Sequence, residues 1–314
     1  MNIVVTGAAG FIGSHTVAEL VRRGHSVRAV DCMLADSYSA ATKRANWSEV
    51  GALDGVELHE LDLRTDGLDD VVAGSDVVVN EAGIAGMSRS WDEVGLYMDL
   101  NVTVVGRLAN ACLRTGVPRF VQASTSSIYG KHVAGDEDLP RQPASPYGAS
   151  NLAAEELLRA YERERGIATT VLRYFSVYGP RQRPDMAYHK FIEATLDGRP
   201  VTVYGDGSYR RSATYVTDVA TATALAVERT SGGEVLNIAG GESIAIADAV
   251  AMIGRHLGIE PIVQSVTPPP GEQVETAGSW SRAADLLGYA PTVRVDDGIA
   301  RQVEWHRSLR VATP

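Results

Sequence analysis

The feature that most constrains the fold of this chain is a run of three evenly spaced glycines between an apolar segment and a helical one. The segment Gly7-Ala8-Ala9-Gly10-Phe11-Ile12-Gly13 follows the apolar residues 3–6, and a helical spacing of apolar residues follows it over 14–24. Glycines allow a tight turn and a close approach of backbone to a ligand, and the first turn of a helix offers unpaired N–H groups. This order predicts a pyrophosphate site, although the spacing is G-x-x-G-x-x-G rather than the commoner G-x-G-x-x-G. The alternative is a glycine-rich turn that binds nothing.

Short apolar segments then alternate with helical ones up to residue 179. Strands are expected in the segments SVRAVD, VELHELD, DVVVNEAG, RFVQASTSS and ATTVLRYFSVYG, and helices over 102–116 and 149–166. Such alternation favours parallel pairing with right-handed crossovers, so we predict an α/β fold with a doubly wound parallel sheet over residues 1–179. Residues 180–314 are richer in polar and proline-containing segments. We expect them to form mainly a smaller C-terminal substrate-binding region, from which some segments could return to the main sheet.

Composition limits the classes of partner. The 314 residues carry a formal net charge of -10, which argues against a protein that binds nucleic acid or an anionic membrane. It does not argue against a phosphate-bearing ligand held by a few arginines. No run of about 18 apolar residues occurs, and no apolar signal segment follows Met1, so we expect neither a membrane span nor secretion. The two cysteines, Cys32 and Cys112, predict no disulfide framework or metal cluster, and a reducing cytoplasm is the expected location.

Two acidic residues follow strands at positions where a dinucleotide would lie. Asp31 ends the second expected strand, 18 residues after Gly13 (31 − 13). A carboxylate there can accept hydrogen bonds from an adenosine ribose and would repel a 2′-phosphate, which favours NAD over NADP. The alternative is an aspartate that only caps the next turn. Asp62 and Leu63 end the third strand and could bind and cover the adenine, on a weaker signal.

The expected catalytic pair consists of Thr125 and Tyr147. Thr125 follows an apolar strand, and ligands bind at the carboxyl edge of such sheets. Tyr147 opens the next helix and could exchange a proton with the same substrate oxygen that the threonine hydroxyl binds. Each residue taken alone is more often a packing or capping residue, but together, after a dinucleotide turn, they form a moderately specific set.

These motifs resemble those of the extended short-chain dehydrogenases/reductases, of the nucleotide-sugar epimerase and dehydratase kind. The segments TGAAGFIGSH, NVTVVGRLANAC, SPYGASN, LRYFSVYGPRQRPDMAYHKF, VYGDGS, TYVTDVA and ADLLGY follow the family order over nearly the whole chain. The resemblance implies a Rossmann-like fold. Within the family the chain is most similar to UDP-glucuronate 4-epimerases, which tend to carry a small hydroxyl residue at the position of Ser176. Ser126 and Ser127 stand where a 4,6-dehydratase would carry Asp-Glu, which counts against dehydration.

The resemblance implies a mechanism and a set of ligands. Tyr147, helped by Thr125, would take the proton of the sugar 4-hydroxyl while hydride passes to NAD, and return of hydride to the opposite face of the 4-keto sugar completes an epimerisation. Serines would hold the carboxylate of a uronate and suppress loss of CO2 from the β-keto acid. NAD is expected on Gly7, Gly10, Phe11, Ile12, Gly13, Asp31, Asp62, Leu63, Asn101, Tyr147, Asn151, Tyr174 and Val177. A UDP-sugar is expected on Arg89, Thr125, Ser126, Ser127, Tyr147, Ser176, Arg183, His189, Lys190, Phe191, Tyr204 and Arg211.

Asn151 is the most consequential departure from the family, which has lysine at this catalytic position. A free tyrosine titrates near pH 10, so only about 0.1% is phenolate at pH 7, and a neighbouring ammonium would raise that fraction. Asparagine can still donate to the nicotinamide ribose but carries no charge. Three explanations are open: a deliberate substitution that traps substrate, a natural change compensated by another cation, or a protein that only binds a sugar nucleotide.

Other positions also differ from the family. Asn80 and Glu81 stand where relatives usually have His-Leu beside the cofactor, and Glu81 could provide new chemistry or a surface contact. Arg89 lies one residue from the usual arginine. The alternatives to uronate epimerisation are therefore decarboxylation of UDP-glucuronate, epimerisation of a neutral UDP-sugar, and non-catalytic binding. Relatives commonly dimerise through two helices, here expected at 102–116 and 149–166.

Overall fold

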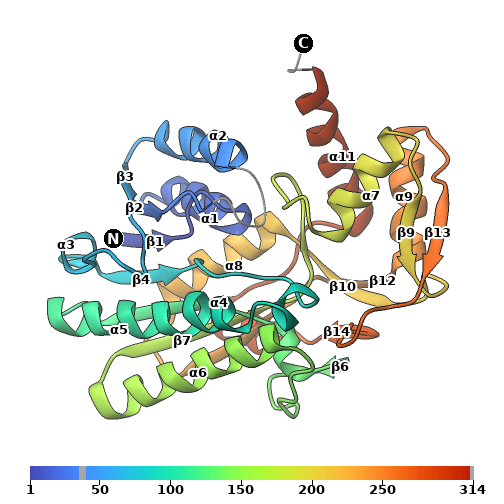
Figure 1. Ribbon diagram of the computed structural model, residues 1–314. Helices are drawn as coiled ribbons and strands as arrows, with labels where there is room; N and C mark the ends of the chain where they lie inside the picture. The colour runs from blue at the N-terminus through green and yellow to red at the C-terminus, as the bar shows by residue number, and fades with distance from the viewer. Residues whose placement is uncertain (35–39, 312–314) are drawn as a thin grey trace.

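The computed structural model describes residues 1–34 and 40–311, and its centre is a parallel sheet of seven strands (Figure 1). The strand order is β11-β7-β5-β4-β1-β2-β3, and every neighbouring pair is parallel. The predicted fold class is confirmed. The strands are β1 (Asn2–Thr6), β2 (Ser26–Asp31), β3 (Val56–Glu60), β4 (Val77–Asn80), β5 (Arg119–Thr125), β7 (Ala168–Tyr174) and β11 (Glu234–Ile238).

Helices cover both faces of this sheet, because successive strand residues point to opposite faces. In β1, Val5 packs into the core beneath one helical layer and Val4 into the core beneath the other. The first layer holds α1 (Phe11–Arg22), α2 (Ala40–Gly51), α8 (Val216–Arg229) and α10 (Ser281–Leu287). The second layer holds α3 (Asp69–Val72), α5 (Val104–Thr115) and α6 (Pro146–Arg165), with α4 (Val94–Met98) beside α6. In the described residues no helix combines the length and the apolar character needed to cross a membrane.

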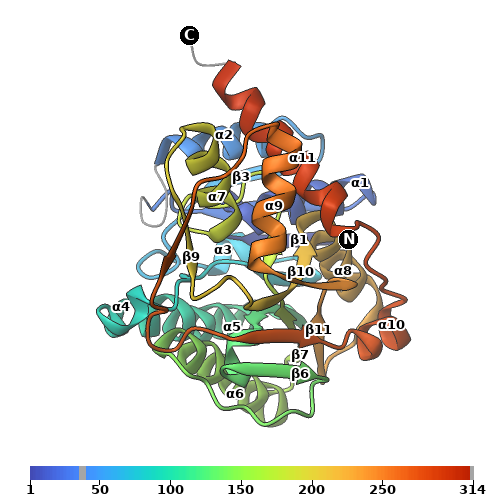
Figure 2. The ribbon, with the colours of Figure 1, turned by 90° about the vertical axis from the view of Figure 1, so that its right-hand side faces the viewer.

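A smaller region, the cap, lies at the carboxyl edge of the sheet (Figure 2). It has its own buried core. Its strands are β6 (His132–Gly135), β8 (Val177–Tyr178), β9 (Val201–Tyr204), β10 (Arg210–Tyr215), β12 (Glu242–Ala245), β13 (Val263–Val266) and β14 (Glu275–Gly278), and its helices are α7 (Ala187–Leu196), α9 (Ile246–Leu257) and α11 (Val295–Val311).

The chain passes between the two regions on both sides of residue 179. After that residue, α8 and α10 return to the first helical layer and β11 pairs with β7 at the edge of the main sheet. Before it, β6 already belongs to the cap, because it pairs with β14 rather than with a neighbour in sequence.

The helix that carries Tyr147 begins earlier than its apolar pattern indicates. Ser145 caps it by accepting a hydrogen bond from the backbone N–H of Gly148 at 3.2 Å, and Pro146 occupies the first turn. Proline suits this position because its missing N–H would be unpaired there in any case. The helix ends at Gly166, whose φ of 77° is the left-handed conformation that glycine adopts without strain. Tyr147 is thereby fixed in the first turn.

A buried ion pair ties this helix to the two central strands. Glu155 of α6 and Arg173 of β7 lie 2.7 Å apart with side chains 0% and 1% exposed. The Ser124 hydroxyl of β5 donates to the same carboxylate at 2.5 Å, and Arg173 also donates to the Tyr129 hydroxyl at 2.7 Å. One carboxylate therefore sets the positions of α6, β5 and β7 relative to one another.

Replacing Glu155 by alanine should destabilise the fold strongly. The substitution leaves a buried guanidinium without its counter-charge, and such losses cost about 3–5 kcal/mol. The matched control is Glu164→Ala, which removes an exposed pair with Arg163 and should cost less than about 1 kcal/mol. Urea unfolding of both variants measures the difference. Equal losses would mean that Arg173 is satisfied without Glu155.

Candidate active site

A cavity of about 820 Å³ lies between the carboxyl edge of the main sheet and the cap. Twenty-two of the residues expected to bind a ligand line it, and two, Arg89 and His189, do not. The residues in its wall are Gly7, Gly10, Phe11, Ile12, Gly13, Asp31, Asp62, Leu63, Asn101, Thr125, Ser126, Ser127, Tyr147, Asn151, Tyr174, Ser176, Val177, Arg183, Lys190, Phe191, Tyr204 and Arg211.

The glycine turn at one end of the cavity fits a pyrophosphate. Gly10 precedes α1 without any side-chain cap, and no acidic residue stands in the first turn of that helix. The N-terminal N–H groups therefore remain available to an anion. Gly13 packs so closely that a Cβ there would lie 2.2 Å from the carbonyl oxygen of Gly7, and Gly7 itself has a φ of +65°. Side chains at these two positions would deform the turn.

Asp31 has the position that a ribose-binding carboxylate requires, and it already has three partners. It accepts hydrogen bonds from the backbone N–H groups of Ala9 at 3.1 Å and Met33 at 2.9 Å. Lys43 of α2 forms an ion pair with it at 2.9 Å. No local pattern in the sequence could have identified Lys43, because the contact joins two elements that only the fold brings together.

The other acidic residue of this end, Asp62, pairs with an arginine that the sequence analysis missed. Arg64 lies 2.6 Å from it, and this hydrogen bond is the main cause that holds the pKa of Asp62 below its usual range. The Arg64 side chain also lines the cavity. An adenosine at this end would meet both a carboxylate and a guanidinium.

Thr125 and Tyr147 meet at the other end of the cavity. The threonine hydroxyl accepts from the backbone N–H of Ser127 at 3.1 Å and forms a hydrogen bond with the Tyr147 hydroxyl. Burial raises the pKa of Tyr147, whereas the hydrogen bond with Thr125 and the charge of Arg183 act to lower it. The ring of Tyr97 packs edge-on against the Tyr147 ring at 6.2 Å. The two expected catalytic residues thus face one space and touch each other.

Asn151 lies one turn after Tyr147 and lines the same space. Its amide donates to the backbone carbonyl of Tyr147 at 2.9 Å. Asn101 stands in a π-helical turn (Asp99–Thr103), accepts from the N–H of Ile84 at 2.8 Å and donates to Ser150 at 3.0 Å. These amides hold the start of α6 against the loop after β4, but neither carries the charge of a lysine. Arg183 is the cation whose charge acts on Tyr147.

Hydroxyl groups and one guanidinium surround the catalytic pair. Ser126 and Ser127 are buried in the 3-10 turn (Ser126–Tyr129) that follows Thr125. Ser176 has a φ of 30°, which is unusual for a residue other than glycine and typical of strained positions at functional sites. Arg183 pairs with Asp185 at 2.8 Å. This set can bind a carboxylate through hydroxyl donors and a shared positive charge.

The cap supplies the remaining side chains of the cavity. Arg211 of β10 donates to Glu272 at 2.5 Å and to the carbonyl of Gln273 at 2.6 Å. Glu272 has a raised pKa because it is buried, although Arg211 acts in the opposite direction. Glu272 was not anticipated, since it lies 61 residues from its partner. An anion that binds Arg211 would compete with this pair.

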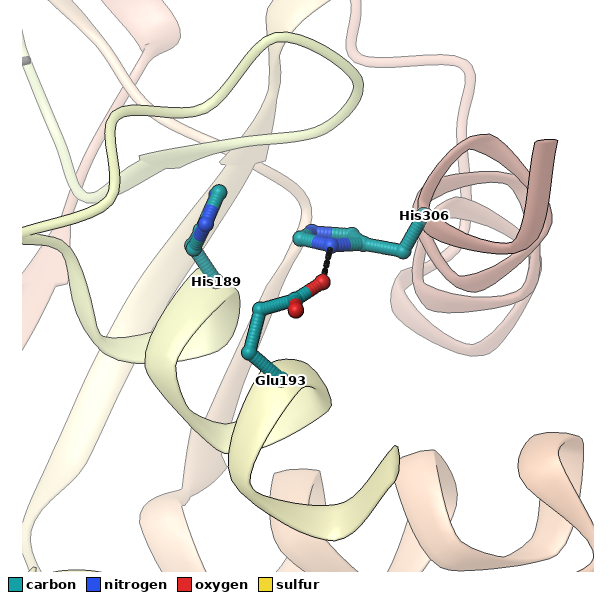
Figure 3. Close-up of side chains that lie close together, drawn as sticks. All are labelled: His189, Glu193 and His306. Carbon is teal, nitrogen blue, oxygen red and sulfur yellow. Dashed lines mark hydrogen bonds and ion pairs between the residues drawn. The ribbon is translucent and has the colours of Figure 1, made fainter. Parts of the chain in front are cut away.

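Two expected ligand residues point elsewhere. Arg89 lies in a 3-10 turn (Arg89–Trp91) and pairs with Glu93 at 2.6 Å. His189 lies on the side of α7 turned toward α11, where Figure 3 shows it beside Glu193 and His306. Its ring centroid is 4.5 Å from that of His306, and Glu193 is 2.5 Å from His306. The residues around it on α7, Tyr188, Lys190 and Phe191, line the cavity, whereas His189 packs against α11.

Glu81, which departs from the family pattern, is partly buried and lies in the wall of the cavity. It follows β4, lines the cavity, and accepts a hydrogen bond from the Tyr174 hydroxyl at 2.8 Å. Burial raises its pKa to about 7, while hydrogen bonds from Tyr174 and Thr16 act in the opposite direction.

Comparison with known proteins agrees with this geometry. A model of the NAD dependent epimerase/dehydratase family matches residues 3–239. The chain belongs to this family. The glycine turn, Asp31 and the Thr125–Tyr147 pair all lie within the matched residues, and the uncapped start of α1 fits the dinucleotide that the family uses.

Relatives in the family carry several activities. A crystal structure of UDP-glucuronic acid 4-epimerase from Bacillus cereus, in complex with UDP-glucuronic acid and NAD, superposes with a TM-score of 0.95 at 36% identity, over 98% of this chain and 100% of that one. The uncharacterised UDP-glucose epimerase YtcB of Bacillus subtilis is 35% identical over 98% of this chain and 99% of its own. A dTDP-glucose 4,6-dehydratase of Streptomyces antibioticus is 34% identical over 99% of this chain and 93% of its own.

Replacing Asn151 by lysine should lower the pKa of Tyr147 and speed any reaction that uses it as a base. The ammonium would favour the phenolate, and general-base effects of this kind are worth about 10²- to 10⁴-fold in rate. The matched control is Asn151→Met, because methionine is about as long as lysine but carries no charge. The pKa of Tyr147 is measured from tyrosinate absorbance as a function of pH, and the effect on rate is measured as turnover. Lysine and methionine variants with equal rates would show that the missing charge does not limit Tyr147.

Proposed function

We propose that this chain is an NAD-dependent nucleotide-sugar 4-epimerase that interconverts UDP-glucuronate and UDP-galacturonate through a transient 4-keto sugar. The observation that carries the proposal is the hydrogen-bonded pair of Thr125 and Tyr147 in the wall of a cavity that also holds the glycine turn. NAD, when bound, supplies the hydride acceptor and donor for carbon 4 of the sugar.

The residues of the chain perform the proton transfers. Tyr147 takes the proton of the sugar 4-hydroxyl, and the Thr125 hydroxyl holds the same oxygen in position. After the 4-keto sugar has turned over, Tyr147 returns the proton to the oxygen on the opposite face. Without a lysine, the positive charge of Arg183 and the N-terminus of α6 are what favour the phenolate.

The hydroxyl set around the catalytic pair supports a uronate as the substrate. Ser126, Ser127 and Ser176 line the cavity, with Arg183 close by. A 4-keto uronate is a β-keto acid, which loses CO2 when its carboxylate bond aligns with the carbonyl π-system. Hydroxyl donors that hold the carboxylate out of this alignment would suppress that loss.

Other functions are distinguished by particular residues. The absence of an acidic pair after Thr125 disfavours 4,6-dehydration, which needs an additional acid and base. Decarboxylation of UDP-glucuronate and epimerisation of a neutral UDP-sugar are enzymatic alternatives. A protein that binds a sugar nucleotide without turnover is the alternative that Asn151 favours.

Incubation with UDP-glucuronate and NAD tests the proposal. We expect an isomer of unchanged mass, detected by mass spectrometry and NMR, because epimerisation neither adds nor removes atoms. Tyr147→Phe should reduce the rate by about 10²-fold or more while retaining binding. Loss of the mass of CO2 would instead indicate decarboxylation. Binding without any product, in the Asn151→Lys variant as well, would indicate a non-catalytic protein.

Ser176→Ala should increase the loss of CO2 relative to epimerisation. A hydrogen bond to a charged group is worth about 1.5–3 kcal/mol, so we expect the product ratio to change about tenfold or more. The ratio is best measured in the Asn151→Lys background, where turnover should be faster, with the exposed Ser308→Ala as the control. An unchanged ratio would mean that Ser176 does not hold the carboxylate.

We also infer that the protein works in the cytoplasm as a homodimer. In Figure 1, α5 and α6 lie side by side in the second helical layer, in green and yellow-green. This layer corresponds to the helices through which relatives pair. The partner of this helical layer would be a second copy of this chain.

A further inference from the structure

Glu81 occupies a position between the glycine turn and the catalytic strands. Its backbone closes over Gly7, where a Cβ would lie 2.8 Å from the carbonyl of Glu81. Its carboxylate accepts from Tyr174, the last residue of β7 and the register partner of Thr125 on β5. Neighbouring strands lie about 4.8 Å apart, so this carboxyl is hydrogen-bonded to the residue next to the catalytic threonine.

In the part of the chain that the structure describes, the groups recorded as acting on Glu81 are hydroxyls and include no cation. Thr16 of α1 donates to it at 3.4 Å, and Tyr174 is in turn 2.7 Å from Thr223 of α8. The ionisable neighbours on α1 are engaged elsewhere, His15 with the carbonyl of Pro180 and Glu19 with Arg22 and Arg23. Within the described residues, the recorded influences on Glu81 are burial and these two hydroxyl bonds.

Only Glu81 among these neighbours changes its charge near neutral pH. Burial raises the pKa of Glu81 to about 7 and lowers that of His15 to about 4. Tyr174 has a pKa raised well above its usual value, chiefly through burial. A carboxyl that is half ionised near neutrality responds to any change of charge in the cavity it lines.

We propose that Glu81 is an electrostatic selector of the cofactor's oxidation state. When ionised, it stabilises the cationic nicotinamide of NAD+ relative to the neutral ring of NADH; when protonated, it does not discriminate. The ring must face the carbinol that Thr125 and Tyr147 hold, and the register partner of Thr125 is Tyr174, whose hydroxyl donates to Glu81. No bond to the cofactor forms, and the titrating proton exchanges with solvent. The inference uses the family's cofactor but not the identity of the sugar.

The coupling between cofactor binding and the ionisation of Glu81 gives the direction of the pH dependence. NAD+ binds more tightly to the ionised carboxyl, so it lowers the pKa of Glu81, whereas NADH leaves that pKa higher. The preference for NAD+ must then increase as pH rises through neutrality. A difference of one unit between the two complexes changes the ratio of dissociation constants tenfold.

The test measures NAD+ and NADH binding to cofactor-free protein between about pH 6 and about pH 8. NADH is followed by its fluorescence, and NAD+ by competition. We expect the ratio Kd(NADH)/Kd(NAD+) to rise about tenfold with pH in the unmodified chain. In Glu81→Gln, which keeps an acceptor for Tyr174, the ratio should not change with pH. Neither measurement requires turnover, so a failure here is distinct from a failure of the proposed epimerase function.

A second buried acid in the same cavity provides the matched control. Glu272→Gln removes a carboxyl of raised pKa at the cap end, beside Arg211, and should retain the full rise of the ratio. Glu81→Leu, which removes both charge and hydrogen bond, should behave as Glu81→Gln does if charge is the cause. A constant ratio in the unmodified chain, or an equal rise in Glu81→Gln, would overturn the proposal.

Discussion

The ion pair between Glu155 and Arg173 is the contact on which the geometry of the site depends. Its carboxylate also accepts from Ser124, and its guanidinium reaches Tyr129. Ser124 immediately precedes Thr125, Arg173 immediately precedes Tyr174, and Glu155 lies about two turns after Tyr147 on α6. A buried ion pair adds little net stability compared with apolar packing. Its directional hydrogen bonds set the positions of the ends of β5 and β7 and of the start of α6. An apolar cluster would define these positions less closely.

The charges around Tyr147 determine how readily its hydroxyl loses a proton, and therefore how well it can act as a base. Burial disfavours the phenolate, and the lysine that would offset burial in relatives is absent. Arg183 offers a physical basis for compensation by another cation, but it shares its charge with Asp185. A uronate carboxylate that binds beside Arg183 would weaken this compensation further.

Much of the fold could be predicted because its signals are local. Apolar runs, the glycine turn and helical spacing depend on neighbours within a few residues, and they place β1, β2, β4 and β5 correctly. Which segment returns to the main sheet, here β11, and the pairing of β6 with β14 could not be predicted, because register between distant strands leaves no local pattern. The start of α6 was missed for another reason: its first turn is defined by the cap at Ser145 and by Pro146 rather than by apolar spacing.

The residues of the candidate site also divide into those that local patterns identify and those that only the fold brings together. Residues in motifs that follow a strand, such as Thr125 and Asp31, lie in the cavity wall because the carboxyl ends of parallel strands share one edge. Lys43 and Glu272 could not be found, since each meets its partner across the fold. The position of His189 could not be predicted, because the spacing around it specifies a helix but not which residues of that helix contact α11.

The two departures at Asn151 and Glu81 change the charge of the cavity in the same direction. One removes a cation beside the nicotinamide ribose, and the other adds an acid beneath the catalytic strands. Without an ammonium at position 151, a phenolate at Tyr147 is harder to form. The carboxyl of Glu81 acts instead on Tyr174, whose pKa it raises in addition to burial. Both departures favour a cationic ring in the same space. Under the proposal made for Glu81, such a cavity binds oxidised cofactor more tightly than reduced cofactor when that carboxyl is ionised.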